Sequence, residues 1–209
     1  MFRALLTALL CYAALAAAEQ PNTLSEQEKR EGYVLLFDGR DLSGWEGDPA
    51  LWSVKGAAIA GSTDGHHLQQ NTFLVGKEKY SDFVLKLDIK LRNHNSGIQF
   101  RSQAHHGWIV SGYQADAAEG AWWGSLYEER GRGVLANGWK GKGEKVVKAG
   151  DWNQYEITAR GIHIQLKLND LVTAELDDEK GAREGIIALQ LHAGPAMQVE
   201  FRNIRLKKL

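Results

Sequence analysis

Apolar and polar residues alternate along most of the chain from position 33 onward. In the segment 83–91 the apolar residues fall on every second position, and the charged residues fall between them. The segment 164–168 repeats this pattern. Because successive side chains of a strand point to opposite faces, the pattern predicts antiparallel strands with one buried and one solvated face.

Two local signals indicate how these strands connect and bend. Asn169 and Asp170 lie between the strand-like runs HIQLKL and LVTAEL, which predicts a tight hairpin. Near the end of the chain the apolar positions change parity at Arg202–Asn203, which predicts a β-bulge. Many short strands with glycine-rich turns, and no long helical period, favour an all-β, two-sheet antiparallel sandwich or jelly roll.

The first residues depart from this β pattern. The run MFRALLTALLCYAALAAAEQ combines the basic Arg3, a short apolar core and three alanines that end at Ala18. This is typical of a secretory signal peptide covering residues 1–18. The apolar run is too short to span a bilayer, and the leucines before Cys11 lack the small residues of a lipoprotein signal. We therefore expect a periplasmic or secreted protein with no membrane insertion after cleavage.

Composition narrows the class of the mature chain. Removing Arg3 from the 25 Lys and Arg residues leaves 24 cations against 26 Asp and Glu, a net charge of −2. This balance argues against nucleic acid as a partner. Cleavage also removes Cys11, the sole cysteine, so no disulfide is available.

The mature chain divides into a polar segment and one domain. Ser25 and Glu28 fit a capping box in the polar segment 19–32, and residues 33–209 are long enough for one domain.

Polar side chains share one face in two neighbouring strand-like segments. Gln99 and Arg101 alternate with apolar residues in NSGIQFRS, and Gln114 and Asp116 do so in GYQAD. Amides, a guanidinium and a carboxylate on one sheet surface offer the donors and acceptors that a sugar requires. The alternative is a solvated face that carries ordinary salt bridges.

Further candidates lie in two other segments. Gln190 and His192 share a face in LQLHAG, so His192 is either a base or metal ligand at a sheet rim, or a structural histidine. Glu128 and Glu129 are adjacent and point to opposite faces of a strand, so only one can enter a cleft. Arg132 either binds a substrate oxygen or pairs with an acid.

The tryptophans divide into two groups. Those in loop-like segments could stack on the apolar faces of sugar rings, whereas those in strand-like or turn segments are expected in the core. The loop group is Trp108, Trp122, Trp123 and Trp139, and the core group is Trp45, Trp52 and Trp152. The chain has no GxSxG, zincin or EF-hand motif.

Taken in order, several motifs resemble the 3-keto-disaccharide hydrolase domain family. They are LFDGRDLSGW at 36–45, YSDFVLKLDIKL, NSGIQFRS, GYQAD, WGSLYEERGRG, DWNQYEITARG and IALQLHAGPAMQVEFRNIRLKKL. The resemblance implies a concanavalin A-like jelly roll, commonly exported, that acts on glycosides oxidised to a ketone at carbon 3. One departure is the bulky Ala121-Trp122-Trp123, which would lie on the aglycone side.

The implied chemistry is elimination followed by hydration. A ketone at carbon 3 acidifies the carbon 2 proton, so a base can form an enolate and expel the aglycone from carbon 1, after which water adds back. We expect His192 or Glu129 as the base, Arg101 as the enolate stabiliser and Asp116 as an anchor for substrate or metal. No cofactor is required, a divalent metal is possible, and the substrate-binding residues are Gln99, Gln114, Trp122, Trp123, Arg132 and Gln190.

Two alternatives remain open. An ordinary jelly-roll glucanase needs two glutamates around an aspartate on one strand, whereas the nearest match, KLDIKL at 86–91, has lysines in those places. A non-catalytic sugar-binding module or lectin would use the same tryptophans and polar face without a base.

Overall fold

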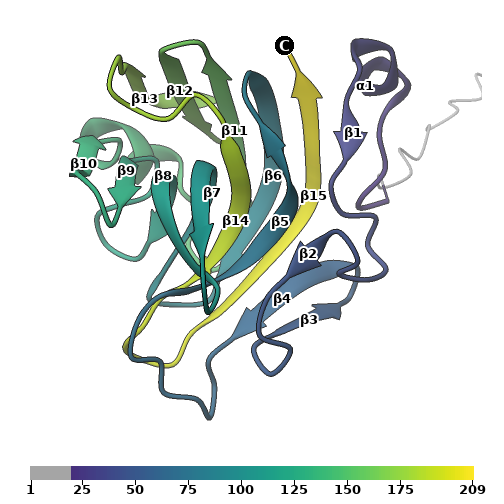
Figure 1. The fold of residues 1–209 in the computed structure, drawn as a ribbon, viewed down its shortest axis with the longest axis vertical. Coiled ribbons are helices and arrows are strands. Elements are labelled where there is room, and N and C mark those ends of the chain that lie inside the picture. The colour runs from purple at the N-terminus through teal and green to yellow at the C-terminus, as the bar shows by residue number, and fades with distance from the viewer. Residues whose placement is uncertain (1–19) are drawn as a thin grey trace, which may run out of the picture.

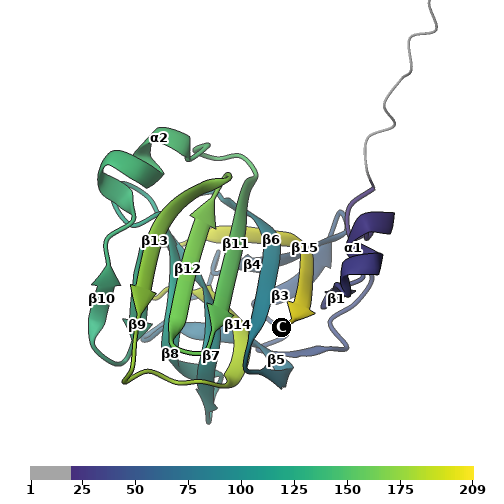
Figure 2. The same ribbon diagram turned by 90° about the horizontal axis from the view of Figure 1, so that it is seen from above.

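The computed structural model describes residues 20–209, so the expected signal peptide, with Arg3, Cys11 and Ala18, lies outside the described residues. Two antiparallel sheets pack face to face (Figures 1 and 2). Sheet A has the order β13 (Leu171–Asp177), β12 (His163–Leu168), β11 (Asn153–Arg160), β6 (Phe83–Leu91), β15 (Gln198–Lys208), β4 (Ala58–Ser62) and β3 (Trp52–Lys55), with β1 (Val34–Leu35) also paired to β15. Sheet B has the order β10 (Gly133–Ala136), β9 (Leu126–Glu129), β8 (Ile109–Ala118), β7 (Asn95–His105), β14 (Gly185–Leu191), β5 (Thr72–Tyr80) and β2 (Trp45–Glu46).

Helices are short. The helix α1 (Glu26–Glu31) begins with the predicted capping box between Ser25 and Glu28, and an irregular turn at Trp139–Gly143 leads into α2 (Glu144–Val146). None of the helices within residues 20–209 has the length and apolarity to cross a membrane. The predicted all-β sandwich is confirmed.

The apolar stripes of the strands form the core between the sheets. In β6, buried and partly exposed residues alternate without exception, and Leu85, Leu87 and Ile89 are fully buried. The predicted hairpin joins β12 to β13, with positive φ at both Asn169 (46°) and Asp170 (67°). Positive φ at both central residues marks the type I′ turn, whose twist matches that of the flanking strands. The predicted bulge also occurs in β15, between Arg202 and Arg205.

A second bulge, which the sequence did not signal, interrupts β7 between Phe100 and Gln103. At this bulge Arg101 adopts a φ of 46° and leaves the face that Gln99 occupies. The expectation that Arg101 shares a polar surface with Gln99, Gln114 and Asp116 is therefore wrong. The extra residue shifts the strand's alternation by one position, which turns the Arg101 side chain into the protein.

Arg101 ties one end of the sandwich together. Its buried guanidinium donates to the carbonyls of Ser81 (2.6 Å) and Gly161 (2.8 Å) and forms an ion pair with Asp82 (2.7 Å). Ser81 and Asp82 form the turn between β5 and β6, and Gly161 lies in the turn between β11 and β12. One side chain of sheet B thus holds two turns that border sheet A.

We predict that Arg101→Met lowers the free energy of unfolding by about 3 kcal/mol, because two carbonyls and a carboxylate lose a buried charged donor. Urea unfolding followed by tryptophan fluorescence measures this change. The matched control is Arg92→Met, which removes a solvent-exposed pair with Asp64 and should cost less than about 1 kcal/mol. Equal unfolding midpoints for the two variants would contradict the structural role of Arg101.

Candidate functional site

Most of the predicted site residues meet in one cavity of about 200 Å³ over the outer face of sheet B. We call it the carboxylate pocket. Its floor comes from β8 and β14, on either side of β7, and its walls come from β9, β10 and the segment before β5. Six predicted residues line it together with four others; the full lining is Asn71, Asn95, Gln114, Asp116, Trp122, Tyr127, Glu129, Val134, Gln190 and His192.

A buried chain of hydrogen bonds orients Asp116. Ser102 Oγ donates to Gln99 Oε1 (2.7 Å), Gln99 Nε2 donates to Gln114 Oε1 (2.7 Å), and Gln114 Nε2 donates to Asp116 Oδ1 (2.6 Å). Every donor in this chain points toward the carboxyl group. Gln99 does not line the carboxylate pocket, so it supports Gln114 and does not reach a ligand; the expectation that Gln99 binds substrate directly is corrected.

Asp116 sits where its carboxyl group can exchange a proton near neutral pH. Burial raises its pKa to about 7, the hydrogen bond from Gln114 opposes this rise, and the negative charge of Glu129 adds to it. A group with such a pKa is populated in both protonation states at neutral pH, as a general acid or base requires. Asp116 is therefore a candidate proton-transfer group as well as a candidate anchor.

His192 presents a ring nitrogen that can accept a proton. Its Nδ1 lies 2.6 Å from the carbonyl oxygen of Ala193. A carbonyl only accepts hydrogen bonds, so Nδ1 carries the hydrogen, and in the neutral ring Nε2 carries the lone pair. The ring of His94 packs edge-on against that of His192, with centroids 5.0 Å apart, and its Nε2 lies 3.1 Å from the same carbonyl.

The two adjacent glutamates diverge as the strand geometry predicts. Glu129 enters the carboxylate pocket, where it accepts hydrogen bonds from Asn71 Nδ2 (3.1 Å) and Gln190 Nε2 (3.5 Å). Glu128 turns away and pairs with Arg132 at 2.6 Å. Arg132 also pairs with Asp178 at 2.5 Å, so its guanidinium is held by two carboxylates outside the pocket. The expectation that Arg132 binds substrate is replaced by the alternative that it pairs with acids.

The tryptophans separate by exposure. Trp122 is 39% exposed and lines the carboxylate pocket together with the 43% exposed Val134, so it can stack on a sugar ring. Trp123 is buried in the core and stacks on Tyr155, with ring centroids 6.2 Å apart, which corrects its expected role in binding. Trp152 also departs from expectation, because it lies half-buried under the guanidinium of Arg202, 4.0 Å from the ring centre.

Four residues of the pocket were not predicted from the sequence, the apolar Val134 and three polar residues. Asn71 bridges two parts of the site, since it donates to Glu129 and its Oδ1 accepts from Ala193 N (3.0 Å). The Oδ1 atom of Asn95 is buried and has no hydrogen-bond partner within residues 20–209. The pKa of Tyr127 is raised by burial and by the charges of Glu129 and Asp116. Tyr127 could have been found from its parity with Glu129; the loop position of Asn71 gives no such signal.

Metal binding was left open by the sequence. Among residues 20–209, no three or more His, Cys, Asp or Glu side chains are grouped closely enough to hold a metal ion.

Comparisons with known proteins identify relatives of this fold. Residues 32–207 match the model of the family described as 3-keto-alpha-glucoside-1,2-lyase-like domain. A structure from Parabacteroides distasonis, provisionally called a glycosyl hydrolase, aligns with a TM-score of 0.69 at 23% identity and covers 91% of this chain and 100% of its own. None of the curated proteins compared with the chain matches it.

Two further solved structures share the architecture at lower identity. The carbohydrate-binding module CBM66 from Bacillus subtilis aligns with a TM-score of 0.57 at 19% identity, over 78% of this chain and 96% of its own. A β-glucanase from Bacillus licheniformis aligns with a TM-score of 0.57 at 10% identity, over 85% of this chain and 99% of its own. At these identities the similarity establishes the fold, which both binding modules and enzymes use.

We predict opposite shifts in the pKa of Asp116 for two pocket variants. Glu129→Gln removes a negative charge and should lower the pKa below about 7, whereas Gln114→Leu removes the donated hydrogen bond and should raise it. Carbon-13 NMR titration of labelled aspartate carboxyls measures both shifts, with Asp116→Asn assigning the signal. Shifts of the same sign would refute the assigned electrostatic causes.

Proposed function

The chain belongs to the family of 3-keto-alpha-glucoside-1,2-lyase-like domains, and we propose that it cleaves 3-keto-glycosides by elimination across carbons 1 and 2 followed by hydration. Membership of this family and the glycosyl hydrolase relative support a carbohydrate-active protein. The observation that carries the finer proposal is the meeting of an acceptor imidazole nitrogen and a carboxyl group with a pKa of about 7 in one small pocket.

In the first half of the reaction, His192 Nε2 takes the proton from carbon 2, and the electron pair moves toward the ketone oxygen. Arg101 does not line this pocket, so neutral groups would donate hydrogen bonds to the enolate oxygen. The candidates are the side-chain amides of Asn71, Asn95 and Gln190, which line the pocket. Protonated Asp116 donates its proton to the glycosidic oxygen as the bond to carbon 1 breaks.

The second half reverses these roles. Asp116, now a carboxylate, takes a proton from water as the water oxygen adds to carbon 1, and His192, after exchanging its proton with solvent, protonates carbon 2. The net result is hydrolysis. Glu129 assists from the side, because its charge keeps the proton on Asp116 and its oxygens hold the amides of Asn71 and Gln190 in place.

A sugar-binding module without catalysis is the second candidate, and the similarity to CBM66 favours it. Such a module would use Trp122 and the amides of the pocket but would have no turnover to lose. We also propose that the protein is exported, on the strength of the sequence pattern of residues 1–18.

The test is an assay of the purified mature chain on 3-keto-glucosides and on their unoxidised parents, with and without a chelator. We predict turnover of the ketones alone, a slower reaction when carbon 2 carries deuterium, and incorporation of solvent hydrogen at carbon 2 of the product. Retention of the carbon 2 label with full turnover would exclude elimination. Binding of the ketone without turnover, at every metal condition, would favour the sugar-binding module.

His192→Ala provides the matching variant experiment. We predict a roughly 10²–10⁴-fold fall in kcat with little change in substrate affinity, because the imidazole acts in the proton-transfer step and not in binding of the substrate. The control is His163→Ala, which removes a histidine paired with Asp177 on the opposite sheet and should leave kcat unchanged. Equal activity of the two variants would eliminate His192 as the base.

A further inference from the structure

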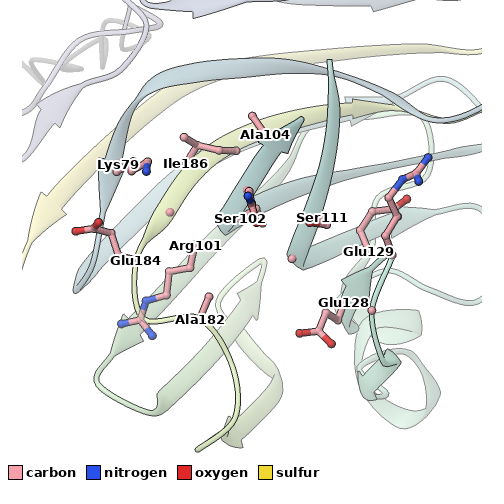
Figure 3. Close-up of a pocket in the computed structure, with 15 residues that line it drawn as sticks. Lys79, Arg101, Ser102, Ala104, Ser111, Glu128, Glu129, Ala182, Glu184 and Ile186 are labelled. Carbon is pink, nitrogen blue, oxygen red and sulfur yellow. The ribbon is translucent and has the colours of Figure 1, made fainter. Parts of the chain in front are cut away.

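Tyr127 is a titratable residue of the carboxylate pocket that the reaction described above does not use. It belongs to β9 and lines the pocket together with Asp116 and Glu129. Glu128 and Glu129 leave β9 in different directions (Figure 3), and Tyr127, two positions before Glu129, shares its face. The larger cavity drawn in Figure 3, over the bulge of β7, is lined by Glu129 but by neither Tyr127 nor Asp116. The phenol of Tyr127 therefore belongs to the carboxylate pocket alone.

The register of β8 and β9 places Tyr127 beside Asp116. Tyr127 pairs directly with Gln114, and Asp116 lies two positions further along β8 on the same face. Residues in this diagonal relation are about 7–8 Å apart, which is within reach of aromatic side chains. A sugar oxygen between the carboxyl group of Asp116 and the hydroxyl of Tyr127 can therefore contact both groups.

The hydroxyl of Tyr127 is available to a ligand. In the part of the chain that the structure describes, the enclosed side-chain polar atoms without a hydrogen-bond partner are Trp52 Nε1 and Asn95 Oδ1. The Tyr127 hydroxyl also has no partner among these residues, but it is not enclosed, because the side chain is only partly buried and borders the pocket. Burial and the charges of Glu129 and Asp116 raise the pKa of Tyr127, so at neutral pH the phenol keeps its proton and can donate a hydrogen bond.

The amide that contacts Asp116 is fully engaged. Gln114 Nε2 donates to Asp116 Oδ1 at 2.6 Å and to Gln190 Oε1 at 3.5 Å, and a primary amide has two hydrogens to donate. Asp116 in its neutral form has one proton. An oxygen that receives this proton can therefore accept a second hydrogen bond from Tyr127, but not from Gln114.

Building on the proposed function, we infer that Tyr127 is a further catalytic residue, whose hydroxyl donates a hydrogen bond to the oxygen on carbon 1. In the first half of the reaction this oxygen belongs to the leaving group, and Asp116 supplies the proton that the oxygen gains as the bond breaks. Tyr127 keeps its own proton and stabilises the negative charge that develops on the oxygen. In the second half the oxygen belongs to water, which accepts a hydrogen bond from Tyr127 while Asp116 takes one of its protons.

The effect of this hydrogen bond depends on the leaving group. The oxygen of an alkyl leaving group is more basic than that of a nitrophenyl group, and it needs more stabilisation as it departs. A donor to the oxygen on carbon 1 therefore assists the alkyl glycoside more than the nitrophenyl glycoside. A donor to the enolate oxygen would assist both to the same extent, because both substrates form the same enolate.

Tyr127→Phe tests this inference, because it removes the hydroxyl and keeps the ring. We expect kcat for methyl 3-keto-glucoside to fall roughly 10²-fold with a smaller change in KM, and kcat for nitrophenyl 3-keto-glucoside to fall less than about threefold. The control is Tyr80→Phe, which removes a hydroxyl from β5 outside the carboxylate pocket and should alter neither value. Equal losses for the two substrates, or no loss for either, would overturn the inference.

Isotope exchange into unreacted substrate provides a second readout. An enolate whose leaving group departs slowly returns to substrate more often and gains solvent hydrogen at carbon 2. In D₂O, methyl 3-keto-glucoside recovered from Tyr127→Phe should therefore carry more deuterium at carbon 2 than that recovered from the wild type at the same conversion. No excess of deuterium would contradict a role for Tyr127 at the leaving oxygen.

The same assays separate this inference from the proposed function. If the wild type cleaves neither glycoside, the proposed function is wrong, and the role of Tyr127 is wrong with it. If the wild type cleaves both glycosides and Tyr127→Phe behaves like the wild type, the reaction stands and the inference alone is overturned.

Discussion

One extra residue in β7 determines how this sandwich is held together and which charges face its pocket. The bulge sends the guanidinium of Arg101 inward, where a buried cation needs a full set of partners to offset its lost hydration. Two carbonyls and Asp82 supply them, and in doing so they join the turns at one end of the sandwich. The same displacement removes a cation from the outer face of sheet B, where Gln114 and Asp116 lie.

The absence of that cation allows the pKa of Asp116 to rise. An arginine beside a carboxylate lowers its pKa by favouring the charged form, as Arg132 does for Glu128 and Asp178. Asp116 instead has an amide from Gln114 and a second carboxylate, Glu129, as its neighbours, and burial dominates, so its pKa rises to about 7. The bulge in β7 thus contributes to the raised pKa of Asp116 in the neighbouring strand β8.

The sequence predicted the features that its apolar pattern records and missed a bulge that leaves this pattern unchanged. The stripe of β6, the hairpin at Asn169–Asp170 and the bulge in β15 all follow from side-chain parity, as does the meeting of Gln114 with Gln190 on one face. The bulge at Arg101 left no trace, because an arginine with positive φ interrupts no hydrophobic pattern. The burial of Gln99 depends on the fit of neighbouring side chains, which periodicity does not describe.

The raised pKa of Asp116 also bears on whether this pocket only binds sugar. In an unfolded chain an aspartate has a pKa of about 3.9, so between about pH 4 and pH 7 the folded state binds more protons than the unfolded state. Stability therefore falls as the pH rises through this range, and near neutral pH the buried carboxyl group is a cost to the fold. An asparagine would offer a ligand similar hydrogen bonds without this cost. Proton transfer requires a group that can bind and release a proton, such as this carboxyl group, whereas sugar binding alone does not.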